Sequence, residues 1–452
     1  MQKLSCLTLC IALAGCSQHS TYQRPELTIA PAWQQVHDIR QPEQAGFWWR
    51  AFNDPQLDRL VDAVLAANPD MYVAALKLKS AQLNSEQANT NLTPSVNGSL
   101  DGSSNKDLKT GKSSNTLGPT LGLSYEVDLW GRLSSVRDQA DWEAAASEQD
   151  LASTRLMLIS KTLTQYWQLG YLSSAISLSE QQLINLERTE RLTEAKYQAG
   201  AITPFGLVQI QQQVAGKRAA LVSLKTQQEQ ANNALKLLLG RSSGPLEYTL
   251  TSLELQPIPE IAVGIPADLL ARRPDVKAAE LRLRKTLARG DEVRASFYPT
   301  LTLTGSASTA SDKLAQVLQN PVGVLGASLT LPFLEYNRNQ LAIDSSELDY
   351  QIAETEFRKQ LYTALVEVED NLVARHHGQQ RLAYLLEQLG YAKESERSAK
   401  VRFEAGATDV QGWLDEQNRL WDVEDSLLVQ QKELLNVTSK IFQASGGGAS
   451  LQ

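Results

Sequence analysis

Leu65-Ala-Ala-Asn-Pro-Asp70 returns later in the same chain as Leu270-Ala-Arg-Arg-Pro-Asp275, and Lys196-Tyr-Gln-Ala-Gly-Ala201 returns as Arg402-Phe-Glu-Ala-Gly-Ala407. The first pair is offset by 205 positions and the second by 206, so a single one-residue gap superimposes the two halves of the 452-residue chain. This period is too long for a solenoid repeat. The sequence therefore predicts duplication of a whole folding unit, in which each half has a counterpart of every main feature.

Each half contains a segment in which apolar and polar residues alternate. Between Thr116 and Leu129 the odd-numbered positions are mostly leucine, tyrosine or valine, while the even-numbered ones are small or polar. A two-residue period over this length is typical of a β-strand with one apolar face. Together with an upstream strand and a polar loop it predicts a β-hairpin at 92–129, and the second half repeats the layout at 298–334.

A stretch that only a very long helix explains follows each hairpin. Residues 133–199 contain no proline and one internal glycine, and their apolar side chains recur at intervals of three and four. At 1.5 Å per residue such a helix extends roughly 100 Å. Residues 338–405 repeat the pattern. Each helix is expected to end at a glycine, Gly200 or Gly406, before a second helix runs back with coiled-coil character.

These patterns predict the order of segments along the chain. Asp54-Pro55 supplies an N-cap and a proline at the first helical position, so a helix is expected from there towards Ala88. The predicted segments are a signal peptide 1–15, an N-terminal segment 16–53, a first copy 54–240 with β-hairpin 92–129 and helical hairpin 133–240, a linker 241–265, a second copy 266–446 with β-hairpin 298–334 and helical hairpin 338–445, and a flexible tail 447–452.

The N-terminus reads as an export signal. Lys3 is followed by a short apolar run that is too short to span a bilayer, which is typical of a secretory signal peptide. The run ends in Leu13-Ala-Gly-Cys16, which resembles the bacterial lipobox and implies cleavage before Cys16 and acylation of its thiol. The next residue is Ser17, not the aspartate that commonly signals retention in the inner membrane. An ordinary signal peptide with an incidental cysteine is the alternative.

Composition and motifs argue against two other classes of protein. The chain has 43 basic and 51 acidic residues and a formal net charge of −8, whereas a nucleic-acid surface needs a basic stripe. His376 and His377 are adjacent, so on a helix they point apart rather than forming a metal-ligand pair. No glycine-rich phosphate loop or nucleophile elbow is apparent. We therefore expect no enzyme activity, no metal, and no cofactor beyond the covalent lipid on Cys16.

The four predicted strands do not suit the core of a soluble sandwich, although ordinary hairpins on a helical protein are an alternative. No segment after residue 16 approaches about 18 uninterrupted apolar residues, so a membrane crossing must be made by strands. Four strands cannot close a barrel, because an open edge in hydrocarbon leaves backbone groups unpaired. Two copies would give eight strands and a filled lumen, whereas three would give twelve and a pore. Three copies are the better inference for a conduit.

Four motifs spread along the mature chain carry a family resemblance. They are Phe47-Trp-Trp-Arg-Ala-Phe-Asn-Asp-Pro-Gln-Leu57, Tyr125-Glu-Val-Asp-Leu-Trp-Gly-Arg132, Gly264-Ile-Pro-Ala-Asp-Leu-Leu-Ala-Arg-Arg-Pro-Asp275 and Arg294-Ala-Ser-Phe-Tyr-Pro299. The chain resembles the TolC-like outer-membrane factors, in the lipoprotein branch of drug-efflux channels typified by OprM and NodT. The resemblance implies a mainly α-helical protein with membrane β structure. Three chains would form a twelve-stranded outer-membrane β-barrel, four strands per chain, continuous with a long periplasmic α-helical barrel.

The resemblance also implies a function and its partners. The N-terminal segment 16–53 and the linker 241–265 would belong to an equatorial belt around the helical barrel. The homotrimer would be a passive exit duct for small molecules such as drugs. It would be anchored in outer-membrane lipid through Cys16, with most of the chain in the periplasm. A periplasmic adaptor would dock it to an inner-membrane pump that supplies the energy.

In that family the tips of the helical hairpins form the periplasmic aperture and meet the adaptor. Here Gly200 and Gly406 would allow the sharp turns. The position of the family's constricting aspartate is Asp415, and the family's nearby leucine and arginine are replaced by Gln411 and Asn418. The predicted aperture residues are Phe403, Gln411, Asp415 and Asn418. Three aspartates converging on an axis repel one another, so each needs a polar partner or a cation.

Two other functions stay open on the residues alone. The first is an outer-membrane conduit for protein secretion, which would share the same architecture. The second is a lipid-anchored periplasmic coiled-coil spacer without a pore. A spacer would have no use for amphipathic β-hairpins, so these hairpins are the feature that separates a channel from a spacer.

Overall fold

The computed structural model describes residues 19–27, 29–33, 47–247, 253, 258–259, 261, 266, 269–309, 311 and 321–447. The predicted signal peptide and Cys16 lie outside these ranges, as do parts of the predicted linker and most of the predicted tail. The chain divides into two compact units. Unit 1 contains residues 75–150 and 275–360 with the residues up to 27, and unit 2 contains residues 28–74, 151–274 and 361–452.

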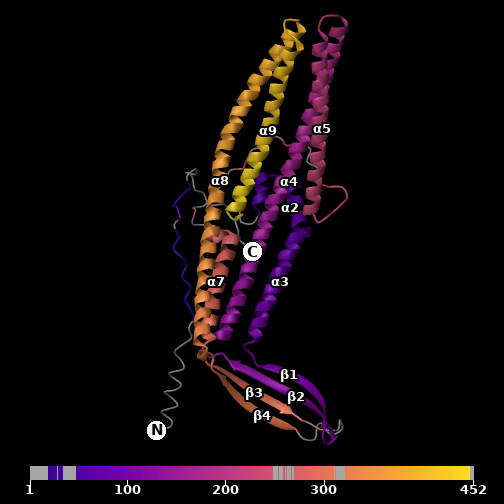
Figure 1. Ribbon diagram of the computed structural model, residues 1–452. Coiled ribbons are helices and arrows are strands. Elements are labelled where there is room, and N and C mark those ends of the chain that lie inside the picture. Colours follow the sequence, from indigo (N-terminus) through magenta and orange to yellow (C-terminus); the bar gives the residue numbers. More distant parts are fainter. Residues whose placement is uncertain are drawn as a thin grey trace. The chain divides into compact units, whose positions relative to one another are not determined.

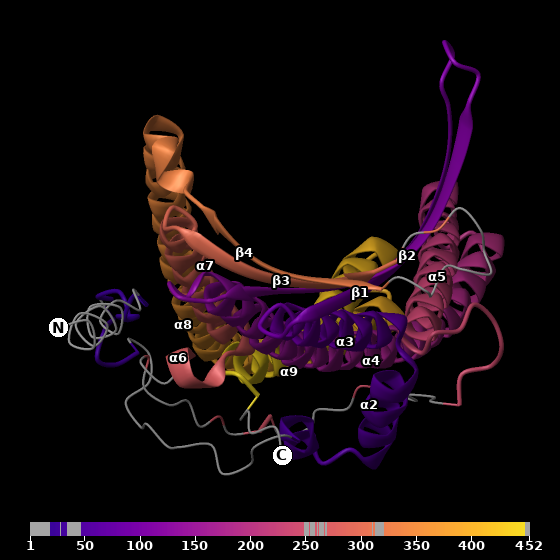
Figure 2. The ribbon, with the colours of Figure 1, turned by 90° about the horizontal axis from the view of Figure 1, so that it is seen from below.

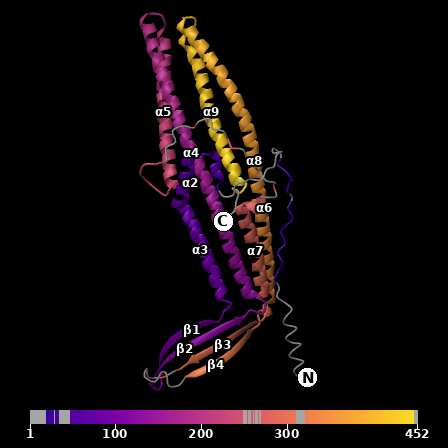
Figure 3. The same ribbon diagram turned by 180° about the vertical axis from the view of Figure 1, so that it is seen from behind.

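Helices make up most of the described chain (Figure 1). They are η1 Trp48–Phe52, α2 Pro55–Ala67, α3 Pro69–Thr90, α4 Arg132–Gln198, α5 Pro204–Leu238, α6 Leu269–Arg272, α7 Pro274–Ala295, η4 Pro332–Leu334, α8 Tyr336–Glu404 and α9 Val410–Ala444. The predicted long helices are confirmed as α4 and α8, with 67 and 69 residues. In unit 2 the helices stand side by side in the order α5, α4, α9, α8 (Figures 1 and 3). Within the described ranges, none of the helices is both long and apolar enough to cross a bilayer.

Unit 1 contains one four-stranded antiparallel sheet. Its strands are β1 Ser95–Lys106, β2 Ser113–Val127, β3 Thr300–Ser308 and β4 Val322–Thr330, in the order β1-β2-β3-β4. Each half of the chain supplies one hairpin, as predicted, and the two hairpins join through the β2–β3 pairing. Figure 2 shows that the sheet is curved along its strands. Strands β1 and β4 are therefore edges whose outer backbone groups have no neighbouring strand in the described part of the chain.

The register sorts the sheet residues onto two chemically different faces. Val96 pairs with Leu123, which pairs with Gly305, which pairs with Leu325, so these positions share one face. By the same alternation, this face carries Val96, Leu100, Leu117, Pro119, Leu121, Leu123, Tyr125, Val127, Leu301, Leu303, Ala307, Leu325, Ala327 and Leu329. The other face is mostly serine, threonine, glycine and asparagine. Leu121 and Leu325 are 57% and 93% exposed, so the single chain leaves its apolar face uncovered.

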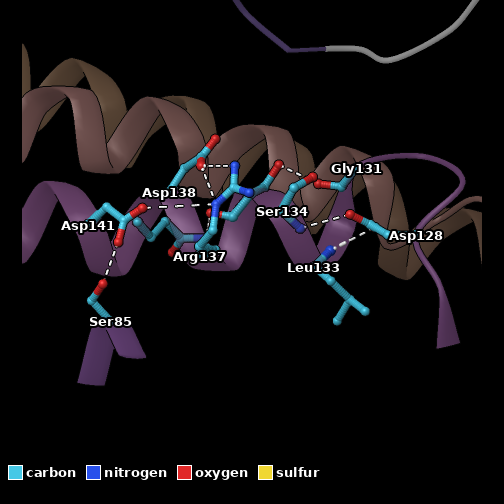
Figure 4. A network of polar contacts seen from close by, with 10 residues as sticks. Ser85, Asp128, Gly131, Leu133, Ser134, Arg137, Asp138 and Asp141 are labelled. Atoms are coloured by element: carbon cyan, nitrogen blue, oxygen red, sulfur yellow. Dashed lines mark hydrogen bonds and ion pairs between the residues drawn. The ribbon is translucent and has the colours of Figure 1, made fainter. Parts of the chain in front are cut away.

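Helix α4 begins directly after the sheet. The Asp128 carboxylate accepts hydrogen bonds from the backbone N–H groups of Leu133 and Ser134, each at 2.9 Å (Figure 4). A carboxylate at this position satisfies free N–H groups and favours the positive end of the helix dipole. Further along, the Asp141 carboxylate accepts a hydrogen bond from Ser85 of α3. Both contacts lie within unit 1, and the Asp128 contacts fix where the 67-residue helix starts.

One prediction about the helices was wrong. A single helix was expected from Asp54 towards Ala88, but the chain forms α2 and α3 with a break at Asn68. Asn68 is extended, with ψ of 128°, because the residue before a proline is disfavoured in the helical region. The duplicated motif places a second break between α6 and α7, at Arg273 and Pro274. The Pro-Asp pair of the repeat therefore marks a helix break in both halves.

Each break is closed by the end of a returning helix in unit 2. The Asn68 side chain donates to the Leu238 carbonyl at the end of α5 at 2.8 Å. In the second copy, Arg273 donates to the Ala444 carbonyl at the end of α9 at 3.3 Å and forms an ion pair with Glu367 at 2.8 Å. Helix ends leave carbonyl groups without intrahelical partners, so these side chains satisfy groups that would otherwise be buried and unpaired.

Two glycines complete the closures. Gly240 and Gly446 have φ values of 67° and 86°. A Cβ at Gly240 would lie 2.6 Å from the Ala67 carbonyl oxygen, and one at Gly446 would lie 2.7 Å from that of Arg272. Both the backbone conformation and the lack of space therefore require glycine.

The main hydrophobic cluster of unit 2 lies beside the first closure. It joins η1 and α2 to residues of α4, α5 and α9, and Trp48 stacks on Phe442 at a centroid distance of 5.4 Å. The buried members are Trp48, Trp49, Leu57, Leu60, Val61, Val64, Ile159, Leu163, Tyr166, Trp167, Leu169, Leu172, Ala231, Leu235, Leu239, Leu253 and Leu435. Asp54 caps α2 as predicted, and its second carboxylate oxygen accepts from the Tyr166 hydroxyl. Burial and this carboxylate raise the pKa of Tyr166.

In unit 1 the N-terminal residues lie along α7. Ser20 donates from its backbone N–H and its hydroxyl to the Asp291 carboxylate, at 2.9 and 2.6 Å. Arg24 forms an ion pair with Glu280 at 2.8 Å, and the Tyr22 hydroxyl donates to the same carboxylate at 3.1 Å. Glu280 and Asp291 are both buried, so the N-terminal segment helps satisfy two carboxylates that would be costly to leave without partners. Burial, followed by the neighbouring Glu280 charge, raises the pKa of Tyr22 to about 12.

We expect Gly240→Ala and Gly446→Ala each to destabilise the protein by about 2–4 kcal/mol, because each substitution combines a left-handed backbone conformation with a backbone clash. Thermal unfolding of the purified protein, followed by circular dichroism, measures the effect. Gly390→Ala is the matched control, since a Cβ there meets no heavy atom within 4 Å and alanine suits a helix interior. Equal melting temperatures for all three variants would contradict the role given to the closures.

Candidate functional site

The predicted turn glycines lie at the two tips of the helical hairpins. Gly200 and Gly406 have φ values of 72° and 71°, and no heavy atom lies within 4 Å of the Cβ that either would carry. Gly200 donates to the Tyr197 carbonyl at 2.9 Å, and Gly406 donates to the Phe403 carbonyl at 3.1 Å. This is the glycine-terminated helix end that the duplicated motif predicts. The glycines are needed here for backbone conformation, not for close packing.

The two tips are joined by contacts around Phe403. Its ring is 2% exposed and stacks on Trp413 at a centroid distance of 5.3 Å. The Lys196 ammonium lies 3.8 Å from the centre of the Phe403 ring and donates to the Phe403 carbonyl at 3.1 Å. Lys196 ends α4 and Trp413 begins α9, so one aromatic residue connects both hairpins. Because it is buried, Phe403 supports the tips by packing, and its place at the aperture stays a prediction.

Gln411, Asp415 and Asn418 lie on one face of α9, at successive intervals of four and three residues. The Gln411 side-chain amide donates to the Asp415 carboxylate at 2.5 Å. Asp415 is exposed, whereas Gln411 and Asn418 are half-buried. Asp415 therefore has a polar partner within its own chain, and its role at a constriction stays a prediction.

Arg419 does not serve Asp415. It is turned to Glu416, with which it forms an ion pair, and the Glu416 carboxylate also accepts from Ser395 of α8 at 2.9 Å. Consecutive residues of a helix point about 100° apart, so Arg419 and Asn418 face different surroundings. The side chain that contacts Asp415 at this tip is therefore the Gln411 amide.

The two tips differ most where the second helix of each hairpin begins. Asp409 caps α9 by accepting the Gly412 N–H at 3.0 Å, whereas α5 begins at Pro204 after Thr203, whose side chain forms no cap. The equivalent of Asp415 in the first copy is Gln209, at an offset of 206. Acidic character at the tips is therefore concentrated in the second copy.

Sequence reasoning missed three contributors to the tips. They are Lys196, Trp413 and Glu396, and the Glu396 carboxylate accepts a hydrogen bond from the Trp413 indole N–H at 2.8 Å. The Lys196–Phe403 contact joins residues 207 positions apart. No helical period carries that information. The one available signal was that Lys196 belongs to the duplicated motif.

Comparison with known proteins identifies the class to which this fold and these tips belong. The profile of the family described as Outer membrane efflux protein matches residues 60–241 and 265–447. The two matched segments correspond to the two copies of the duplicated unit, and together they cover more than half of the chain.

Relatives and solved structures agree with the family match. The chain is 26% identical to the Toxin and drug export protein A of Aggregatibacter actinomycetemcomitans, over 99% of this chain and 98% of that protein. It is 28% identical to the Pyoverdine export outer membrane protein OpmQ of Pseudomonas aeruginosa, over 99% and 97%. The open state of the Neisseria gonorrhoeae MtrE outer membrane channel matches with a TM-score of 0.86 at 25% identity, covering 96% of this chain and 98% of that one.

The chain belongs to the outer membrane efflux protein family. Its fold is that of the TolC-like outer-membrane channels, with a duplicated unit that is mainly helical and supplies four antiparallel strands. The protein is an efflux channel of the outer membrane, and its family is one of ducts rather than enzymes.

We expect Asp415→Ala to raise the resting conductance of the channel several-fold, because it removes both the carboxylate and the partner that holds Gln411 in place. Single-channel recording in planar bilayers measures the change. Glu416→Ala is the matched control, since it removes the adjacent carboxylate that is held by Arg419 and Ser395. If Asp415→Ala conducts like the unaltered protein, Asp415 is an ordinary solvated carboxylate.

Proposed function

We propose that three copies of this chain form the outer-membrane duct of a tripartite efflux system for small molecules. The observation that carries the proposal is the sheet of unit 1. It has an exposed apolar face, an opposite face of small and hydroxyl side chains, and two open edges. Such a sheet is suited to a wall between lipid and water.

The open edges set the number of chains. In the order β1-β2-β3-β4 all neighbours are antiparallel, so β4 of one copy can pair in the same sense with β1 of the next. Every backbone group then has a partner, as a hydrocarbon environment requires. Three copies supply twelve strands, which leaves an open lumen, whereas eight strands are filled by side chains.

The relatives suggest the cargo and the partners. Their names include a Toluene efflux pump outer membrane protein and an Antibiotic efflux pump outer membrane protein, both from Pseudomonas putida and both 28% identical to this chain. We infer that this protein is likewise a passive exit for small molecules. A periplasmic adaptor would bind the tips around Gly200 and Gly406, and an inner-membrane pump would supply the energy.

We also propose that Cys16 carries the acyl anchor, by the lipobox that precedes it. Only three residues separate Cys16 from Ser20, which is held by Asp291 near the end of α7. At about 3.5 Å per residue, the lipid would then lie within about 14 Å of that contact. The protein would then be anchored in the outer membrane both by the acyl chain and by strands β1–β4.

The function is tested by reconstituting the purified protein into planar bilayers and by deleting its gene. We expect discrete conductance steps from the protein and increased sensitivity of the deletion strain to lipophilic drugs. Lack of any conductance would favour the spacer. Normal drug sensitivity together with lost export of a protein would favour the secretion conduit.

We expect Cys16→Ser to abolish acylation, seen by mass spectrometry as an N-terminal peptide without acyl chains, and to leave trimers resolvable by size-exclusion chromatography. The reason is that Arg24, Tyr22 and Ser20 hold the N-terminal segment on α7 without help from a lipid. The double variant Cys16→Ser/Arg24→Met removes the Arg24–Glu280 ion pair as well as the lipid, so it tests the contribution of that contact. Loss of assembly with Cys16→Ser alone would show that the lipid, and not the contacts of the N-terminal segment with α7, is the essential tether.

A further inference from the structure

A groove of about 530 Å³ lies between α4, α5 and α9 in unit 2. Its volume is in the range of sites that take small organic molecules. The lining residues on which the argument depends are Tyr171 and Ser179 from α4, Lys217 from α5, and Trp421, Asp422 and Asp425 from α9. Small side chains, among them Ala175 and Ala220, leave the space open.

The groove contains an ammonium and a carboxylate that do not pair. Lys217 is half-buried, and its Nζ lies 5.2 Å from the centre of the Trp421 ring. Neither Lys217 nor Asp422 forms a hydrogen bond or ion pair with a residue that the structure describes. Burial lowers the pKa of Lys217, against the pull of the nearby Asp425, Asp422 and Glu424 charges. A half-buried cation without a hydrogen-bonded anion beside it is unfavourable, and an anionic group bound next to Lys217 would relieve that cost.

The α9 wall has the opposite character. Asp422 and Asp425 are one turn apart and exposed, and Asp425 raises the pKa of Tyr171 by a smaller amount than burial does. The groove also has unsatisfied hydrogen-bonding capacity. Ser179 is 3% exposed, and neither its Oγ nor the Oε1 of Gln213 has a hydrogen-bond partner among the residues that the structure describes. Buried polar atoms are nearly always paired, so these two are exceptions that call for a reason.

The duplication shows that the charges are particular to this groove. At the offset of 206, Lys217 corresponds to Val423, Asp422 to Gly216, and Asp425 to Ala219. The two halves share their helices, their turns and their closures, yet neither copy repeats the charges of the other. The charged groups are therefore not remnants of the common scaffold.

We propose that the groove binds small zwitterionic molecules, with their carboxylate at Lys217 and their ammonium group at Asp422 and Asp425. The two walls offer complementary charges to the two ends of such a ligand, and the aromatic rings of Trp421 and Tyr171 flank its chain. Asn418 belongs both to the groove and to the predicted aperture. If these molecules are also cargo of the duct, that role rests on the proposed function. Their binding in the groove does not depend on it.

The test is calorimetric titration of the full-length protein in detergent with 4-aminobutyrate and 6-aminohexanoate. Hexylamine and hexanoate, which carry one charge each, are the comparison ligands. We expect a zwitterion to bind about tenfold more tightly than either, since it satisfies both walls at once. Equal affinity for all four molecules, or no binding by any of them, would overturn the proposal.

Two lysines on the same helix give a matched pair of variants. Lys217→Met should weaken 6-aminohexanoate binding about tenfold, as should Asp422→Asn, because each removes one charged contact. Lys225→Met should leave binding unchanged, since Lys225 lies outside the groove and pairs with Glu180 at 2.9 Å. If Lys217→Met also lowers the melting temperature, Lys217→Arg is the second variant to measure. It keeps the positive charge, so it should bind 6-aminohexanoate with most of the original affinity. An equal loss in Lys217→Met and Lys225→Met would contradict the site.

Measuring the conductance of the same preparation tests the duct separately from zwitterion binding in the groove. A preparation that conducts but binds no zwitterion overturns the groove and leaves the duct intact. A preparation that binds the zwitterion through Lys217 but never conducts supports the groove and overturns the duct.

Discussion

Much of this fold depends on two places where a helix end is held against a helix break. Gly240 and Gly446 approach carbonyl oxygens so closely that no side chain fits, and Asn68 and Arg273 donate to the last carbonyls of the returning helices. The contacts answer two needs together, since helix ends must have their carbonyls satisfied and the chain must turn in a left-handed conformation. Each closure fixes where a 35-residue helix returns after its excursion to the tip. A short motif therefore determines the course of a much longer segment.

Those features that depend on local pattern could be predicted from the sequence. Alternation from Thr116 gave the strands, spacing of threes and fours gave the two long helices, and Gly200 and Gly406 marked the tips. The break at Asn68 was missed, although the following proline encodes it, because the apolar period continues across it. The Lys196–Phe403 contact and the groove could not be foreseen, since both depend on which helices become neighbours in space.

The two copies have kept their backbone and diverged in their side chains. The breaks recur at an offset of 205 and the turns and closures at 206, while most of the acidic residues of α9 have neutral counterparts in α5. Backbone conformation and side-chain identity differ in how easily they can change. A backbone conformation that only glycine adopts tolerates no substitution, whereas an exposed position on a helix accepts almost any residue at a cost of a few tenths of a kcal/mol. Charge has therefore diverged between the two copies more freely than backbone conformation has.

The two edge strands of the sheet have different compositions. β1 is rich in serine, asparagine and glycine and includes Asp101 and Lys106, whereas β4 is mostly valine, leucine, alanine and glycine. Charged and small residues discourage an edge strand from adding to a copy of itself. In a single chain whose apolar face is uncovered, β1 is thereby hindered from pairing with β1 of another copy. The polar edge discourages this wrong pairing, whereas the uncharged β4 edge carries no such protection.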